Sequence, residues 1–253
     1  SITADAPDPA IYLSDSAFPK ERHNGIQTHF LSGHPIAFTA ISPFEYFPAT
    51  DELVFYQNLT VDIEYAPTAR AISAMSMLKK DSFTAKRLSD SVDNPVPEYR
   101  ENRESGAEYL IISDQDKMSN WQPLADYYEG LGISTQIVSV SSILTSTEGS
   151  DTQEKIRNYI IATFAANPLR YVLLGGDTDV IPHRGFSVDM GTGGESDDDI
   201  PADMYYSCLD GNWNNDGDNN WGELYETDLT PELAIGRICY NSDLEIANQI
   251  YKI

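Results

Sequence analysis

Short apolar runs alternate with helical patterns along the second half of the chain, and this alternation restricts the possible folds more than any other feature. The runs at 109–113, 136–140 and 171–174 are largely apolar, as expected of strands that are covered on both faces. Residues 119–132 and 150–164 lie between them and carry helical signals. Because strands and helices alternate, we expect an α/β fold with a parallel sheet and covering helices.

Local signals predict where the helices begin. Ser119 and Ser150 are each followed three residues later by Gln, which is the spacing of a capping box. A fourth strand is expected at 233–236, followed by a helix from about Ser242. That helix is expected to continue to Ile253, so the sequence predicts that the chain stops within a domain.

The first part of the chain has the texture of an antiparallel β domain. Residues 36–41 and 53–56 are rich in β-branched and aromatic side chains, and residues 61–65 alternate between apolar and charged. Turn-forming residues separate these runs. We therefore expect a small antiparallel β domain before the α/β domain, with strands between about Gln27 and Tyr65.

A polar stretch at about 98–106 is predicted to be the linker between the two domains. This gives a β-rich domain and linker over 1–105 and an α/β domain over 106–253. With 253 residues, of which 41% are hydrophobic, the chain is long enough for one large or two modest cores.

The charge of the chain excludes some partners. The formal net charge is -24, so nucleic acids and anionic membranes would be repelled. No apolar run approaches the roughly 18 residues that a membrane span needs. The strand at 109–113 lacks a following G-x-G-x-x-G, and no P-loop motif occurs, so a flavodoxin-like domain that binds a small ligand is disfavoured.

Eleven acidic residues and no Lys, Arg or His lie between Glu195 and Asp228, and this region contains the loop D-G-N-W-N-N-D-G-D-N-N-W-G-E, from Asp210 to Glu223. Counted from Asn212, its oxygen-bearing residues and Gly217 follow the spacing of an EF-hand loop. Calcium prefers six to eight oxygen ligands, and alternate residues of a tight loop can supply them. The candidate metal ligands are Asp210, Asn212, Asn214, Asp216, Asp218 and Glu223.

The loop also departs from an EF-hand. Its flanks at 204–207 and 232–235 have the pattern of strands rather than paired helices, and Asn219 stands where an apolar residue is usual. We therefore expect a calcium loop of EF-like spacing between strands. The alternative is a flexible, solvated acidic loop. Calcium is favoured over this alternative, because repulsion among so many carboxylates disfavours a compact loop without metal.

The order and spacing of several segments resemble the opening of a gingipain-type cysteine peptidase domain. The upstream β segment, with F-P-A-T at 47–50 and L-V-F-Y at 53–56, is similar to the propeptide-type β domain of that family. The segments that carry the likeness of the catalytic part are Tyr109–Ile112, Pro123–Tyr128, Gly132–Val138, Ile156–Ile160, Leu169–Asp177, Ile181–Pro182, Pro201–Tyr206, the acidic loop and Ala234–Ile238.

The resemblance implies a caspase-like fold with two catalytic subdomains, of which this chain holds the first. The nucleophilic Cys and its His are expected in the second subdomain, so no catalytic residue is assigned here. Cys239 is expected to be a structural thiol, and its pairing with Cys208 stays open. Asp203 matches an acidic substrate-pocket position of arginine-cleaving members and would pair with a basic side chain.

Two functions remain for this chain. The first is a fragment of a secreted or cell-surface cysteine endopeptidase, whose partners are a protein or peptide substrate and the second catalytic subdomain. Such an enzyme would attack a peptide carbonyl with a Cys thiolate that a His activates. The second is a non-catalytic, calcium-stabilised surface or adhesion module that keeps the fold.

Overall fold

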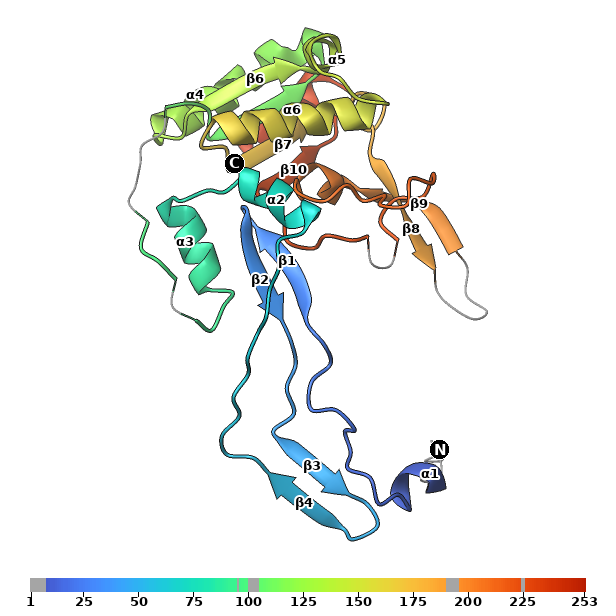
Figure 1. The fold of residues 1–253 in the computed structure, drawn as a ribbon. Coiled ribbons are helices and arrows are strands. Elements are labelled where there is room, and N and C mark those ends of the chain that lie inside the picture. The colour runs from blue at the N-terminus through green and yellow to red at the C-terminus, as the bar shows by residue number, and fades with distance from the viewer. Residues whose placement is uncertain (1–7, 95, 100–104, 190–195, 224–225) are drawn as a thin grey trace. The chain divides into compact units, whose positions relative to one another are not determined.

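The computed structural model describes residues 8–94, 96–99, 105–189, 196–223 and 226–253 (Figure 1). The strands are β1 (Gln27–Leu31), β2 (His34–Phe38), β3 (Phe44–Phe47), β4 (Glu52–Phe55), β5 (Tyr109–Ser113), β6 (Thr135–Ser139), β7 (Tyr171–Gly175), β8 (Arg184–Asp189), β9 (Ser196–Ala202) and β10 (Ala234–Ile238). The α-helices are α1 (Pro9–Tyr12), α2 (Ala69–Ser76), α3 (Ser82–Ser89), α4 (Gln122–Gly130), α5 (Val140–Ser146), α6 (Thr152–Ala166) and α7 (Asp243–Tyr251), and the 3₁₀ helices are η1 (Gln115–Trp121) and η2 (Asp203–Tyr206).

The chain divides into two compact units. One contains the residues up to His29 together with Pro35–Thr68, and the other contains Phe30–His34 and Ala69–Ile253. The second, larger unit therefore includes the turn between β1 and β2, in addition to all helices from α2 onward. We call it the α/β unit.

Antiparallel hairpins form the N-terminal part of the chain. β1 pairs with β2, and β3 pairs with β4 in the register Phe44↔Phe55. The prediction of antiparallel β structure before the α/β region is confirmed. The strand predicted at 61–65 is wrong, because that segment is irregular and its apolar residues Val61, Ile63 and Tyr65 are exposed rather than packed against a partner strand.

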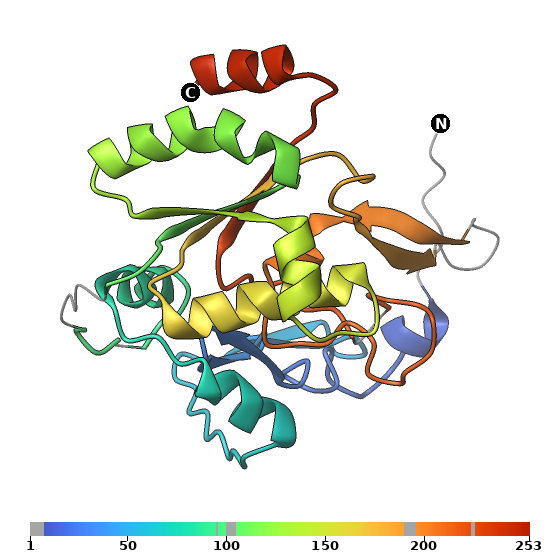
Figure 2. The ribbon, with the colours of Figure 1, turned by 90° about the horizontal axis from the view of Figure 1, so that it is seen from above.

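A four-stranded parallel sheet in the order β10-β7-β5-β6 lies at the centre of the α/β unit. Figure 2 shows α4 and α7 on one side of this sheet and α5 and α6 on the other. The predicted α/β class with flanking helices is confirmed. The alternation of strand and helix was sufficient for this prediction because parallel neighbours need a crossover segment.

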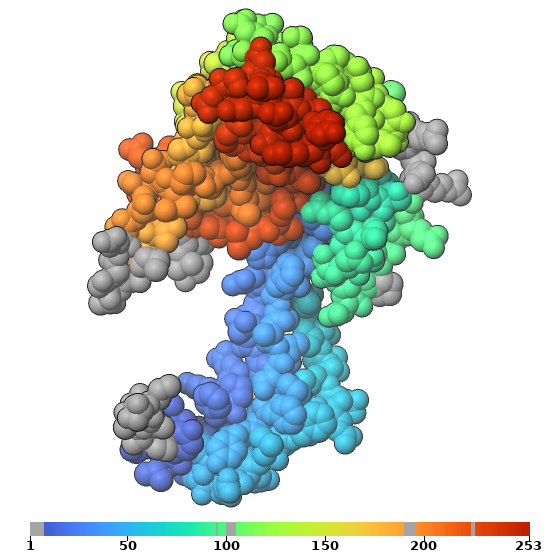
Figure 3. Space-filling model, turned by 180° about the vertical axis from the view of Figure 1, so that it is seen from behind, coloured from blue at the N-terminus to red at the C-terminus, as the bar shows by residue number. Residues whose placement is uncertain are grey.

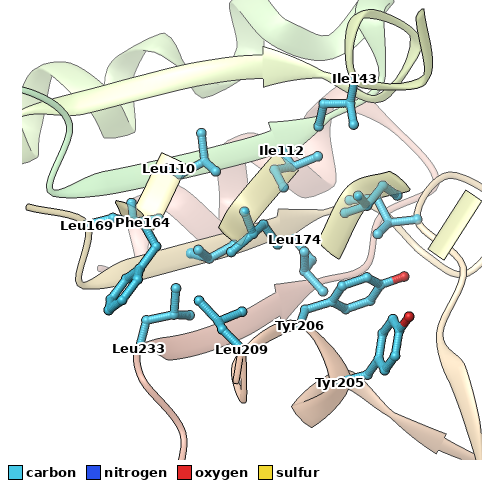
Figure 4. Close-up of a cluster of buried hydrophobic side chains, with 14 of the residues drawn as sticks. Leu110, Ile112, Ile143, Phe164, Leu169, Leu174, Tyr205, Tyr206, Leu209 and Leu233 are labelled. Atoms are coloured by element: carbon cyan, nitrogen blue, oxygen red, sulfur yellow. The ribbon is translucent and has the colours of Figure 1, made fainter. Parts of the chain in front are cut away.

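Successive residues of the central strands enter two different cores. Leu110, Ile112 and Leu174 pack toward α5 and α6, in the cluster that Figure 4 shows. Ile111 and Leu173 face the opposite way and pack with Trp121, Leu124 of α4 and Ile246 of α7. Burial on both faces explains why these strands are nearly continuous apolar runs.

The predicted capping boxes are wrong in detail. Ser119 lies inside η1 and does not cap α4. Helix α6 is capped one residue later than predicted, by Asp151, whose carboxylate accepts a hydrogen bond from the Glu154 amide at 2.7 Å. The Glu154 side chain accepts from the Ser150 amide at 2.6 Å, so the return hydrogen bond comes from the residue before the N-cap and not from Asp151 itself.

Other element predictions also need correction. The segment at 204–207 belongs to η2 and the residue after it rather than to a strand, and Val140 opens α5 rather than closing β6. Helix α7 begins after Ser242 as predicted, but it ends at Tyr251 instead of continuing to Ile253. In Figure 3, α7 lies on the surface, where Leu244 remains 69% exposed.

Helices α2 and α3 were not predicted, because residues 66–97 show only weak patterns. Most of the predicted linker lies outside the described residues, and the predicted domain boundary at 105/106 stays a prediction.

Candidate functional site

Three buried carboxylates meet in the α/β unit. Asp210, Asp228 and Glu232 are only 8%, 1% and 1% exposed, and one oxygen from each lies within 4.8 Å of the others. We call this group the buried acid cluster. Buried carboxylates are rare unless they are paired or bind a cation, because desolvation penalises their charge.

Core residues next in the chain fix the positions of two cluster members. Leu209 precedes Asp210 and Leu233 follows Glu232, and both side chains point into the hydrophobic core in Figure 4. Arg157 of α6 fixes the segment that carries Asp210. Its buried guanidinium donates to the carbonyls of Tyr205, Cys208 and Gly211 at 2.5–2.8 Å. The cluster is therefore held on a rigid frame.

The cluster has more acceptor oxygens than the protein satisfies. Glu232 accepts from the amides of Leu209 at 2.7 Å and Ser32 at 3.3 Å, and one Asp228 oxygen accepts from the Thr230 amide at 3.0 Å. Both Asp210 oxygens and the second oxygen of Asp228 are buried without a hydrogen-bond partner. Such buried acceptors are uncommon, and the cluster could hold a metal ion.

The environment raises the pKa of two cluster members. Burial first, and then the neighbouring acids Asp228 and Glu232, raise the pKa of Asp210 to about 9. Burial also raises the pKa of Glu232 to about 7, against the effect of its hydrogen bond from Leu209. Without a metal ion, the cluster therefore retains protons that its residues would lose in water.

The donor set of the cluster fits a calcium ion. Oxygens that share one calcium at about 2.4 Å lie no more than about 4.8 Å apart, and carboxylates are the ligands that this hard cation prefers. The three residues satisfy this limit, and three of their oxygens accept no hydrogen bond.

A second acidic group forms in the loop predicted to bind calcium. Oxygens of Asp216, Asp218 and Glu223 lie within 4.8 Å of one another, but Asp216 and Asp218 are exposed. Desolvation, followed by the neighbouring carboxylates, raises the pKa of Glu223. We call this group the loop acid cluster.

The frame of the loop is anchored in the core. Trp213 is fully buried, stacks on Phe186 with a centroid distance of 4.5 Å, and accepts a backbone hydrogen bond from Gly222 at 2.8 Å. Gly222 has a φ of +74°, and a Cβ atom there would lie 2.8 Å from the Phe186 ring. The acidic residues therefore lie on a loop whose two ends are fixed.

The six predicted ligands separate into three groups. Asp216, Asp218 and Glu223 come together, whereas Asp210 belongs to the buried acid cluster. The side chains of Asn212 and Asn214 form hydrogen bonds within the loop, where the amide oxygen of each side chain accepts a hydrogen bond from a backbone N–H group. A single EF-like calcium site with all six residues therefore stays a prediction.

Sequence reasoning did not identify Asp228 and Glu232 as candidate ligands. Both lie beyond the twelve-residue loop spacing, and Glu232 was interpreted only as the start of a strand. The available signal was the absence of any basic residue between Glu195 and Asp228, followed by a further acid next to a strand.

Asp203 lies close to the carboxyl ends of β7 and β10. Its carboxylate forms a two-point ion pair with Arg237, with oxygen–nitrogen distances of 2.7 and 2.8 Å. Arg237 also donates to the carbonyls of Gly176 and Ile181 at 2.9 and 2.8 Å. Arg237 therefore orients the Asp203 carboxylate, which the sequence predicts to contact a substrate.

The two cysteines are free thiols in different settings. Cys208 is buried and Cys239 is exposed, after the end of β10. Desolvation and then the Asp177 carboxylate raise the pKa of Cys239, which disfavours the nucleophilic thiolate. Among the described residues, no helix is both long and apolar enough to cross a bilayer.

Sequence families match most of the chain. Residues 102–253 match Peptidase family C25, and residues 8–85 match the C25 propeptide. A search of curated proteins returned no match.

Several solved structures are similar to this chain. The complex of Porphyromonas gingivalis RgpB pro- and mature domains is 20% identical with a TM-score of 0.39, over 58% of this chain and 28% of that one. The Arg-specific cysteine proteinase gingipain R (RgpB) is 20% identical with a TM-score of 0.40, over 60% and 28%. Dimeric latent PorU from P. gingivalis is 13% identical with a TM-score of 0.40, over 89% and 20%.

This chain thus spans little more than a quarter of the length of the RgpB chains it matches. The family match, in contrast, covers more than half of this chain and includes the parallel sheet and both acid clusters. The chain therefore belongs to peptidase family C25.

Proposed function

We propose that this chain is the propeptide-like region and first catalytic subdomain of a secreted or cell-surface cysteine endopeptidase. The supporting observation is the succession of a C25 propeptide match and a C25 peptidase match along one chain. The Cys–His pair that attacks the peptide carbonyl belongs to residues outside this sequence, and protein or peptide chains are the substrates. The raised pKa of the Cys239 thiol supports a nucleophile other than Cys239.

Labelling of the full-length gene product tests this proposal. A peptidyl chloromethyl ketone should alkylate one cysteine other than Cys208 and Cys239, and peptide mapping should locate it. The 253-residue chain alone should not hydrolyse Arg- or Lys-containing reporter peptides. Turnover by this chain that disappears in Cys239→Ala would contradict the assignment.

The second candidate function is a non-catalytic module that calcium stabilises. The buried acid cluster supports this second function, because a cation site can stabilise a fold without taking part in catalysis. A full-length protein that neither hydrolyses peptides nor reacts with the cysteine-directed probe would support this function instead of the first.

We further propose that calcium is the cofactor of both acid clusters. Asp210, Asp228 and Glu232 would hold the tighter ion, because their oxygens are already collected on a rigid frame. The loop acid cluster, with exposed ligands, would hold a second ion more weakly. Bound calcium supplies positive charge that offsets the buried carboxylates and stabilises the fold.

Melting temperature measures this effect. Calcium should raise it and a chelator should lower it, with a stabilisation of about 2.7 kcal/mol at a hundredfold excess over Kd. Asp228→Asn should remove most of the response, whereas Glu223→Gln should remove only the part that needs high calcium. An equal response in Asp228→Asn and wild type would contradict a calcium ion at the buried acid cluster.

Asp203 is our candidate for a substrate-contacting carboxylate. It is partly exposed, with 28% of its side chain accessible, and it lies near the carboxyl ends of the parallel strands, where α/β sheets place their ligands. Each carboxylate oxygen can accept more than one hydrogen bond, so a basic substrate side chain could share Asp203 with Arg237.

A further inference from the structure

A part of the propeptide-matching segment lies directly against the buried acid cluster. The Arg70 guanidinium on α2 is 3.7 Å from Asp228 and 3.9 Å from Asp210. These distances are those of ion pairs without direct hydrogen bonds. The Ser32 amide, in the turn between β1 and β2, donates to the Glu232 carboxylate at 3.3 Å.

The same turn is packed closely onto the end of α2. Gly33 has a φ of +80°, and a Cβ atom there would lie 2.6 Å from the Leu78 backbone. The Ser32 carbonyl accepts from the Lys79 amide at 3.1 Å, and Arg70 lies over the Phe30 ring at 5.4 Å. The turn and α2 therefore form one docked patch, which consists of Phe30–His34 and Ala69–Ser76.

We propose that Arg70 is a tethered cation that competes with calcium for the buried acid cluster, so that calcium weakens the docking of α2 and the turn. This inference rests on the calcium function proposed above. It assigns to Arg70 a regulatory role in the contact between the propeptide-matching patch and the catalytic region.

Charge and distance give the sign of the coupling. Arg70 is attracted by carboxylate oxygens of Asp210 and Asp228 that accept no hydrogen bond. A divalent ion among these oxygens would satisfy them and repel the guanidinium. The Arg70 side chain is 41% exposed, so it can turn toward water without leaving a buried charge unpaired. Calcium therefore removes an attraction at small cost to the arginine.

Coupling of this kind is reciprocal. If calcium weakens the Arg70 contact, removal of Arg70 must strengthen calcium binding by the same factor. The sign distinguishes this arrangement from a site in which cation and patch support each other, where loss of Arg70 would weaken or not change calcium binding.

Calorimetric titration of the chain with calcium chloride tests the prediction. The Glu223→Gln background reduces binding by the loop acid cluster. Arg70→Gln should tighten binding at the buried acid cluster on the order of fivefold, whereas Arg70→Lys, which keeps the charge, should stay near the parent. Lys86→Gln is the matched control, because it removes an equal charge from an exposed position on α3.

Amide hydrogen exchange provides a second measurement that needs no variant. Calcium should speed exchange in α2 and at the β1–β2 turn of the wild-type chain, and this acceleration should be absent in Arg70→Gln. Slower or unchanged exchange in α2 with calcium bound would overturn the proposal. So would Arg70→Gln affinity equal to that of Lys86→Gln.

The outcomes separate this inference from the function on which it rests. If Asp228→Asn leaves calcium binding intact, the buried calcium site itself is wrong, and the role of Arg70 is overturned with it. If Asp228→Asn abolishes the tight site but Arg70→Gln does not tighten it, only the competition is wrong.

Discussion

At the scale of single residues, the buried acid cluster carries an electrostatic cost that has a definite direction. Burial raises the pKa of Asp210 from its ordinary value of 3.8 to about 9, and it raises the pKa of Glu232 from 4.5 to about 7. The native state therefore binds more protons than the unfolded chain between these values. The stability that these groups contribute is fully present below their pKa values in the unfolded chain. It is lost as the pH rises through their pKa values in the folded protein.

In chelator, the free energy of unfolding should consequently fall as the pH rises from about 4.5 toward 9. Asp210→Asn should flatten the upper part of this dependence, and Glu232→Gln the part up to about 7. Asp243→Asn is the control, because Lys117 lowers the pKa of Asp243 and moves its effect to lower pH.

Urea denaturation at several pH values measures these slopes. Calcium should reduce or reverse the wild-type slope, since the ion binds deprotonated carboxylates and its affinity rises with pH. A chelator-treated wild type with the same slope as Asp210→Asn would contradict the raised pKa of Asp210.

At the scale of elements, α6 connects the hydrophobic core to the turn that carries Asp210. Its start depends on Asp151, which caps the helix and also accepts two hydrogen bonds from the nearly buried Arg184 at 2.9 Å. Farther along the helix, Arg157 holds the carbonyls before and after Asp210. A weak start of α6 would therefore disturb the frame of the buried acid cluster.

Asp151→Ala should lower the free energy of unfolding by about 2–4 kcal/mol, because it removes a cap worth about 1 kcal/mol and leaves Arg184 without its carboxylate. Asp151→Asn keeps the capping oxygen and should cost less. Asp81→Ala on α3 is the matched control, since Asp81 accepts the capping hydrogen bond from Thr84 at 2.7 Å, and it should cost about 1 kcal/mol. Equal losses for Asp151→Ala and Asp81→Ala would show that the Arg184 pair adds no stability.

At the scale of the whole molecule, the chain combines a match to the C25 propeptide with a match to Peptidase family C25, and residues of both contribute to the α/β unit. The turn at Phe30–His34 and helix α2 lie in the propeptide match but belong to the same compact unit as the peptidase match. The boundaries of the sequence families and of the compact units therefore differ.

Limited proteolysis should cut the chain in the polar stretch at about 98–106, because it contains many charged and small residues and few that can anchor it. The expected products are an N-terminal fragment and an α/β fragment, which mass spectrometry identifies. They should stay associated in gel filtration through the docked patch. Cuts confined to other loops would contradict the predicted linker.

The sequence by itself determined the α/β class, the sheet strands and the approximate position of most helices of the sheet region. These follow from local chemistry, since strands buried on both faces must be apolar and helices must repeat at their own period. It also identified the acidic loop, because nine Asp, Asn or Glu residues occur within fourteen positions.

Only the tertiary structure decided which acids meet. Asp210, Asp228 and Glu232 are separated by up to 22 positions and share no spacing rule, and Arg70 joins them from far earlier in the chain. Their proximity depends on the packing of Leu209, Leu233 and Arg157, which no local pattern records. Helices α2 and α3 were not predicted for the same reason. They depend on packing against the rest of the protein rather than on a strong helical pattern in their own sequence.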